Sequence, residues 1–151
     1  MFLAYSAAVA ALILLPSKSQ PLMVEVVYAQ WTEKDETATE AIPRSYRATC
    51  TLYLSIAGVG ESANAGLGSD LTKIHVQASL KERHKDYVLA NVRIGATTSK
   101  KGLSHEMPIT STTESLVRLD MKKWTVLARD NTAGSIKGFL IRILDSGSPK
   151  P

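Results

Sequence analysis

Two short runs of alternating apolar and polar side chains constrain the fold of this chain more than any other feature. Apolar residues stand at every second position from Ile74 to Leu80 and again from Val88 to Ile94. A β-strand places successive side chains on opposite faces, so this period of two is typical of a strand with one buried face. We predict a β-hairpin in which Leu80 faces Val88, with residues 83–85 as its loop.

Five further segments have the composition or the alternation of β-strands. They are residues 22–31, 46–56, 116–119, 124–127 and 136–144. The third and fourth of these flank a charged turn at 120–123, so we expect them to form a second hairpin. About seven strands with few helical periods predict an all-β fold, an antiparallel β-sandwich or open barrel.

The segments between the strands are expected to be loops. Residues 32–43 are acidic and polar and are interpreted as an exposed connection with room for one helical turn. Residues 58–68 are rich in glycine, but they match neither the dinucleotide pattern GxGxxG nor the P-loop pattern. We therefore expect a flexible loop there and not a phosphate site.

The N-terminus has the features of a secretory signal peptide. Residues 2–15 are apolar and uncharged, Pro16 follows, and Ser17 and Ser19 are small residues suited to the positions before a cleavage site. We expect 1–19 to be a signal peptide, with an uncleaved membrane anchor as the alternative because no Lys or Arg precedes the run. Residues 20–145 would then be a single β domain and 146–151 a disordered tail, in a secreted or periplasmic protein.

Charge and cysteine content exclude some functions. The chain has 18 Lys and Arg against 14 Asp and Glu, and its Lys100-Lys101 and Lys122-Lys123 pairs do not form a basic stripe, so no nucleic-acid binding is expected. Cys50 is the single cysteine, which leaves no intrachain disulfide. It is in phase with apolar neighbours and is expected to be a small core residue.

Patterns that carry catalytic or metal chemistry are not recognisable in this sequence. The three histidines, His75, His84 and His105, have no second histidine at a ligand spacing, so neither metal nor cofactor is assigned. No catalytic residue is assigned either. A hydrolase site built from His105, Glu106 and Asp70 on loops is left open as an alternative.

Four aromatic residues form the candidate binding surface: Trp31, Tyr53, Tyr87 and Trp124. Exposed aromatic rings stack on sugars or on peptide side chains, so a glycan or a peptide is the expected ligand class. The interpretation that we favour, however, is that these rings cap the ends of the sandwich and cover the edges of the core.

Residues 110–143, TSTTESLVRLDMKKWTVLARDNTAGSIKGFLIRI, are similar to the C-terminal portion of secretins, the outer-membrane channel proteins of bacterial secretion systems. The resemblance implies a Ser/Thr-rich lead into a strand with Val117 and Leu119, a turn at Lys122-Lys123, and a second strand at 125–127. Ala128-Arg129 stands where the family usually carries a glycine pair. The resemblance implies a stand-alone domain of a Gram-negative envelope and not a channel.

Together these features predict an exported, non-enzymatic β-domain that acts by binding or assembly at the bacterial cell envelope. The expected partner is an envelope protein, or a second copy joined through an uncovered sheet edge. A carbohydrate-binding module and the loop-built hydrolase are the alternatives.

Overall fold

A computed structural model describes residues 20–37, 39, 41–68, 72–98 and 109–144. The predicted leader and tail lie outside these residues. No helix of the described part has the length and apolarity needed to cross a membrane.

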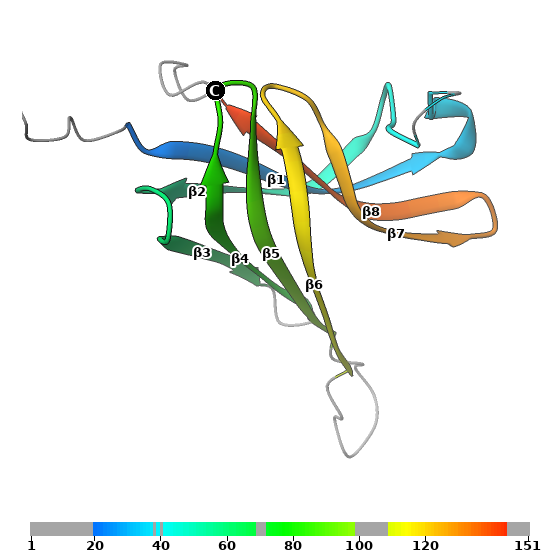
Figure 1. Ribbon diagram of the computed structural model, residues 1–151. Helices are drawn as coiled ribbons and strands as arrows, with labels where there is room; N and C mark the ends of the chain where they lie inside the picture. Colours follow the sequence, from blue (N-terminus) through cyan, green and yellow to red (C-terminus); the bar gives the residue numbers. More distant parts are fainter. Residues whose placement is uncertain (1–19, 38, 40, 69–71, 99–108, 145–151) are drawn as a thin grey trace, which may run out of the picture.

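The described residues form two four-stranded antiparallel sheets that pack face to face (Figure 1). The first sheet has the order β2-β1-β8-β7, with β1 at Leu22–Thr32, β2 at Arg47–Ile56, β7 at Thr125–Thr132 and β8 at Ser135–Leu144. The second has the order β3-β4-β5-β6, with β3 at Ser62–Gly68, β4 at Thr72–Arg83, β5 at Tyr87–Thr98 and β6 at Ile109–Asp120. A short 3-10 helix, η1, spans Glu33–Asp35. The predicted all-β sandwich is confirmed, with eight strands in the described part instead of about seven.

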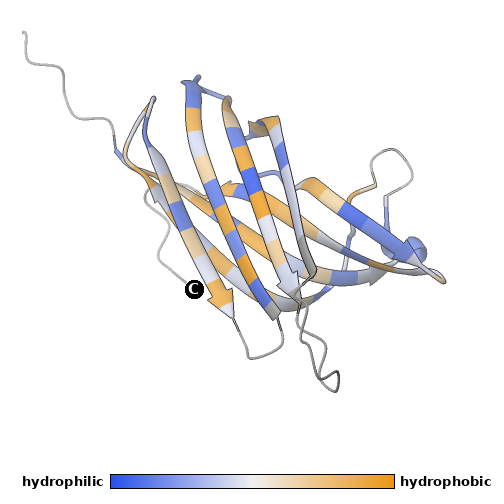
Figure 2. Cartoon of the chain, turned by 90° about the horizontal axis from the view of Figure 1, so that it is seen from below, coloured by the Kyte–Doolittle hydropathy of each residue, from blue (hydrophilic) through white to orange (hydrophobic). Residues whose placement is uncertain are grey.

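Alternating side chains from both sheets form the main core between them. Figure 2 shows the resulting alternation of apolar and polar bands along the strands. The core includes Val24 and Leu54 of the first sheet and Val76, Leu80 and Val92 of the second. Burial of such side chains is the main favourable term in folding, about 25 cal/mol for each Å² of apolar surface.

The predicted central hairpin forms, but its register and loop differ from the prediction. Leu80 faces Ala90, and Val88 faces Arg83, so the loop is residues 84–86. The register shifts between Leu80 and Glu82, where Lys81 is an extra residue in a β-bulge. The observed pairing is two residues away from the predicted one, and a two-residue shift keeps every side chain on its face. Alternation therefore could not distinguish the two registers.

The glycine-rich segment was wrongly predicted to be entirely loop. Its second half is strand β3, which pairs along its whole length with β4. Ala63 and Ala65 are partly buried against the core. Gly and Ala have low strand propensity, so the pairing is determined by the neighbouring strand and not by local preference.

The predicted second hairpin does not exist. β6 pairs with β5 and β7 pairs with β8, so residues 121–124 carry the chain from one sheet to the other. A parallel bridge between Met121 and Ile143 holds this crossing, and Lys122 has a φ of 63°. The two-residue hairpin of this region joins β7 to β8 instead, with positive φ at Ala133 and Gly134 as a type I′ turn requires.

A second apolar cluster lies on the outer face of the first sheet. It consists of Val27, Ala29, Trp31, Ile136 and Leu140, with Trp124 and Val126 packed against it. The connection between β1 and β2, which was predicted to be an exposed segment, contains the buried Pro43 and the half-buried Ile42. The first sheet therefore has apolar side chains on both faces.

Candidate functional site

β7 is the outermost strand of the first sheet. It pairs with β8 on one side, and within the described residues no strand pairs with its other side. After the crossing at 121–124 its direction departs from that of β6 (Figure 1). A sheet edge of this kind presents backbone N–H and C=O groups that can pair with another chain.

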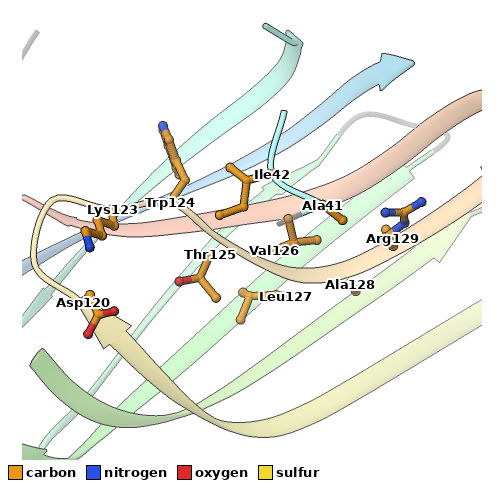
Figure 3. Close-up of a pocket in the computed structure, with 10 residues that line it drawn as sticks. All are labelled: Ala41, Ile42, Asp120, Lys123, Trp124, Thr125, Val126, Leu127, Ala128 and Arg129. Carbon is orange, nitrogen blue, oxygen red and sulfur yellow. The ribbon is translucent and has the colours of Figure 1, made fainter. Parts of the chain in front are cut away.

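A groove of about 730 Å³ runs along this edge (Figure 3). Ala41 and Ile42 of the β1–β2 connection stand on one side of β7, the side to which Trp124 and Val126 point. Thr125 and Leu127 point to the opposite side, toward the end of β6. The edge backbone therefore has apolar side chains on each of its two faces.

The β1–β2 connection, which forms one wall of the groove through Ala41 and Ile42, is held over β7 by two interactions of the Glu36 carboxylate. Glu36 Oε1 accepts a hydrogen bond from the indole Nε1–H of Trp31 at 2.9 Å and forms an ion pair with Arg129 of β7, also at 2.9 Å. The Glu36 side chain is only 14% exposed. Beyond Glu36 the connection folds back on itself through a bridge to Pro43 and through the amide of Thr37, which donates to the carbonyl of Ile42 at 3.0 Å. Ile42 is thus positioned by the structure and is not part of a free loop.

The base of the connection is fixed by η1. Asp35 accepts hydrogen bonds from the backbone N–H of Thr32 at 3.0 Å, the Thr32 hydroxyl at 2.8 Å and the Ser45 hydroxyl at 3.0 Å. These hydrogen bonds hold the pKa of Asp35 below its ordinary value. The bond from the Thr32 backbone has the largest effect, followed by the bond from the Thr32 hydroxyl and then the one from Ser45. The two ends of the connection are therefore joined through the Asp35 carboxylate.

The charged side chains at the groove differ in their pairing. Asp120 bonds Arg118 at 3.1 Å in an exposed pair, and Arg129 is paired with Glu36. Lys123 lines the groove and forms no ion pair with any residue that the structure describes. The groove therefore has a cationic end beside an apolar floor.

The structure brings together two of the four predicted aromatic residues. Tyr53 and Trp124 both lie on the outer face of the first sheet, on either side of Glu25 and Arg142. Arg142 Nε bonds Glu25 Oε2 at 2.6 Å, and its guanidinium carbon lies 4.3 Å from the Trp124 ring centroid. Tyr46, which the sequence reasoning passed over, meets Trp124 edge to face with centroids 5.9 Å apart.

The other two predicted residues are not part of this surface. Trp31 is 3% exposed and lies under the connection, so it serves the core. Tyr87 belongs to the second sheet, where its ring stacks on His84 and lies 3.9 Å from the Arg118 guanidinium. The Trp31 ring is therefore part of an apolar cluster and not of an exposed surface.

The pKa of Tyr46, a tyrosine on the outer face of the first sheet, is raised above its ordinary value. Desolvation is the largest cause, and the negative charge of Glu25 adds to it, whereas Arg142 acts in the opposite direction. Tyr46 and Tyr53 are nonetheless 37% and 39% exposed. Their rings are available to a ligand at the surface.

Cysteine and histidine provide no reactive cluster in the described part of the chain. Cys50 is half-buried beside Tyr28, and desolvation raises the pKa of its thiol, which disfavours the nucleophilic thiolate. His75 is exposed on β4, and His84 contacts Glu82 at 2.9 Å. No group of three or more His, Cys, Asp or Glu among the described residues could hold a metal ion. His105, Glu106 and Asp70 lie outside the described residues.

The groove wall was missed by the sequence reasoning because residues 32–43 have an acidic, polar composition. The signal that was present is the Ile42-Pro43 pair, an apolar interruption of this polar segment. The partner of Glu36, in contrast, is 93 residues away in the chain and has no local signature.

Fold and groove together define an antiparallel β-sandwich protein with an unpaired edge strand. No protein-family model, curated protein or solved structure matches the chain.

Proposed function

We propose that this protein is an exported, non-enzymatic binding module of the bacterial cell envelope that accepts an extended segment of a partner protein along β7. The observation that carries the proposal is the free edge of β7 bordered by the groove. In strand addition, backbone hydrogen bonds supply affinity, and pockets for alternate side chains supply specificity.

The groove meets both requirements. Successive side chains of an added strand point to opposite faces of the sheet. On the outer face they meet Ile42, Trp124 and Val126, and on the inner face they meet Leu127. Each face therefore offers an apolar contact, while the edge backbone supplies the hydrogen bonds.

The test uses a displayed library of random 12-residue peptides selected on the purified protein. Selected peptides should lose at least tenfold in affinity for the Ile42→Glu variant, because a carboxylate then has to be desolvated in the groove wall. Leu116→Glu is the matched control, since Leu116 is 67% exposed on the other sheet. Equal binding to both variants would contradict the proposal.

Amide hydrogen exchange locates the bound peptide independently. Outward-facing amides of β7 should become protected when the peptide binds, whereas those of the other edge strands, β2, β3 and β6, should not change. Protection confined to β2, β3 or β6 would move the site away from β7 and refute the assignment.

The exported location rests on the apolar run at residues 2–15 and the small residues after it. The resemblance of residues 110–143 to secretins supports the same compartment. Mass spectrometry of the protein recovered from the envelope fraction should give a chain that begins at Gln20. A full-length chain in the membrane pellet would favour the uncleaved anchor, and a full-length chain in the cytosol would refute export.

A second candidate function is glycan binding on the outer face of the first sheet. The observation that favours it is the pair of exposed rings, Tyr46 and Tyr53, beside the donor and acceptor groups of Arg142 and Glu25. Sugars are bound by aromatic stacking combined with such polar groups. A glycan-array signal that Tyr53→Ala abolishes and Tyr87→Ala retains would support it, and a signal equal in both variants would not.

A further inference from the structure

The sequence of β7 is complementary to a second copy of itself. We infer that two copies of this protein pair through their β7 edges, antiparallel about a two-fold axis, and so join two four-stranded sheets into one. This inference rests on the proposed strand acceptance at β7, and it names the occupant of that edge.

The bulge in β7 determines which two-fold pairing is possible. The register to β8 shifts between Val126 and Ala128, so Leu127 is the extra residue. Before the bulge, Val126 packs against the outer-face cluster, and Thr125 is opposite the core residue Ile141. After it, Ala128 is opposite the inner residue Phe139.

The β8 residues opposite the rest of β7 show to which face each remaining β7 side chain points. Arg129 is opposite Gly138, where a side chain would meet Trp31 of the outer-face cluster, so Arg129 points to the outer face. Asp130 is opposite the adjacent residue, Lys137, and therefore points to the inner face. Opposed residues of an antiparallel pair must point to the same face. This condition restricts the position of the axis.

Only a two-fold axis between Leu127 and Ala128 matches the faces along the whole strand. It places Leu127 opposite Ala128 on the inner face, Val126 opposite Arg129 on the outer face, and Thr125 opposite Asp130 on the inner face. Moving the axis by half a residue toward the start of β7 makes Leu127 face itself, and it places the outer Val126 opposite the inner Ala128. A half-residue move the other way makes Ala128 face itself but opposes Leu127 and Arg129, which point to different faces.

The charges of the segment are complementary in the same register. Lys123, which lacks a described ion-pair partner, comes opposite Thr132 and so diagonally next to Asp130 of the partner subunit, within reach of its long side chain, and by symmetry the contact occurs twice. Asp130 likewise forms no described ion pair. The outer-face side chain of Val126 enters beside Ile42 of the partner subunit, in the groove described above. Charge complementarity and apolar contact therefore coincide in one arrangement.

The test is the mass of the purified protein in solution, measured by light scattering on a sizing column over a range of concentrations. The wild type should be a dimer that dissociates on dilution. Lys123→Glu and Asp130→Lys should each raise the dimer dissociation constant about tenfold, because each replaces two opposite-charge contacts with two like-charge contacts. An equimolar mixture of the two variants should recover dimers, since Glu at 123 then meets Lys at 130.

Lys81→Glu is the control, because Lys81 is exposed in the bulge of the other sheet. A wild type that stays monomeric at all concentrations would overturn the self-pairing. So would a dimer that Lys123→Glu and Lys81→Glu weaken equally, or a mixture of variants that does not recover dimers.

Failure of this inference can be distinguished from failure of the proposed function. A monomeric wild type that binds library peptides in an Ile42-dependent manner would refute self-pairing and retain strand acceptance, with a foreign segment as the occupant. The Asp130→Lys variant is expected to have a β7 edge that no second copy occupies. If a bound peptide protects amides of this variant elsewhere than in β7, strand acceptance itself is refuted.

Discussion

Gly138 lies against the ring of Trp31 so closely that no other residue fits. A Cβ at position 138 would be 2.7 Å from Cη2 of Trp31 and 2.5 Å from the carbonyl oxygen of Ala128 in β7. The bulge brings the β7 backbone toward β8 at the same point. Because Trp31 also holds Glu36, the close packing at Gly138 connects the bulge, the outer-face cluster and the groove wall.

Gly138→Ala is therefore expected to lower the free energy of unfolding by about 2 kcal/mol, since the added methyl forces the indole and the β7 backbone apart. Urea denaturation measures the effect. Gly95→Ala is the matched control, because a Cβ there would meet only the Thr112 hydroxyl at 3.9 Å. An equal loss in both variants would mean that strand glycines matter here for a general reason and not for this contact.

Glu36→Gln should loosen the groove wall with little effect on the whole fold. The amide keeps the size of the side chain but removes the charge that pairs with Arg129. The amide of Thr37, which bonds Ile42, should exchange several-fold faster, while the free energy of unfolding falls by about 1–2 kcal/mol, because the Glu36 side chain of this pair is largely buried. Glu61→Gln, in an exposed loop, should leave the Thr37 exchange rate as in the wild type; a similar acceleration there would count against the role of Glu36.

A double-mutant cycle on Glu25 and Arg142 should give a coupling energy of about 1–3 kcal/mol, because the carboxylate is buried and its bond to Arg142 is charge-assisted. Glu25→Gln and Arg142→Gln, singly and together, are followed by urea denaturation. The Arg118–Asp120 pair provides the comparison, since its side chains are 61% and 45% exposed. Its coupling should be below about 0.5 kcal/mol, and a result of similar size for both pairs would contradict the assigned role of burial.

Alkaline pH should destabilise the protein through Tyr28. Burial first, then the charges of Cys50 and Asp130, raise the pKa of its hydroxyl above the ordinary value of 10.0. The unfolded chain therefore loses this proton at a lower pH than the folded chain does. The contribution of Tyr28 to the free energy of unfolding is thus fully present below pH 10, and it is lost as the pH rises through the pKa of the folded state. The urea midpoint should fall less steeply above pH 10 in Tyr28→Phe than in the wild type. Parallel pH profiles would show that Tyr28 is not responsible.

The sequence predicted the elements with a buried face far better than it predicted their partners. The alternation in 74–80 and 88–94 identified both strands and their inner faces correctly, because each inward position removes an apolar side chain from water. It placed the pairing register two residues off, since faces repeat every two residues. The segment at Ser62–Gly68 was missed for the opposite reason, as its small side chains carry no hydrophobic signal of their own.

The candidate site was less accessible to sequence reasoning. Trp124 was recognised as a surface candidate, but the roles of Ile42, Glu36 and Arg129 depend on contacts between distant segments. Trp31 and Trp124 are both tryptophans near strand ends, yet one is enclosed by the connection and the other lines the groove. Local sequence does not distinguish these two environments.

The sequence by itself thus determined the fold class, because the two-residue period of apolar side chains is a local property that only half-buried strands satisfy. The tertiary structure decided which strands pair, and it separated β6 from β7 although only four residues connect them. The physical reason is that pairing depends on the backbone hydrogen bonds and packing of whole sheets, and a short connection can either turn within one sheet or cross to another. That crossing leaves the edge of β7 unpaired in the described structure, and the proposed binding site depends on it.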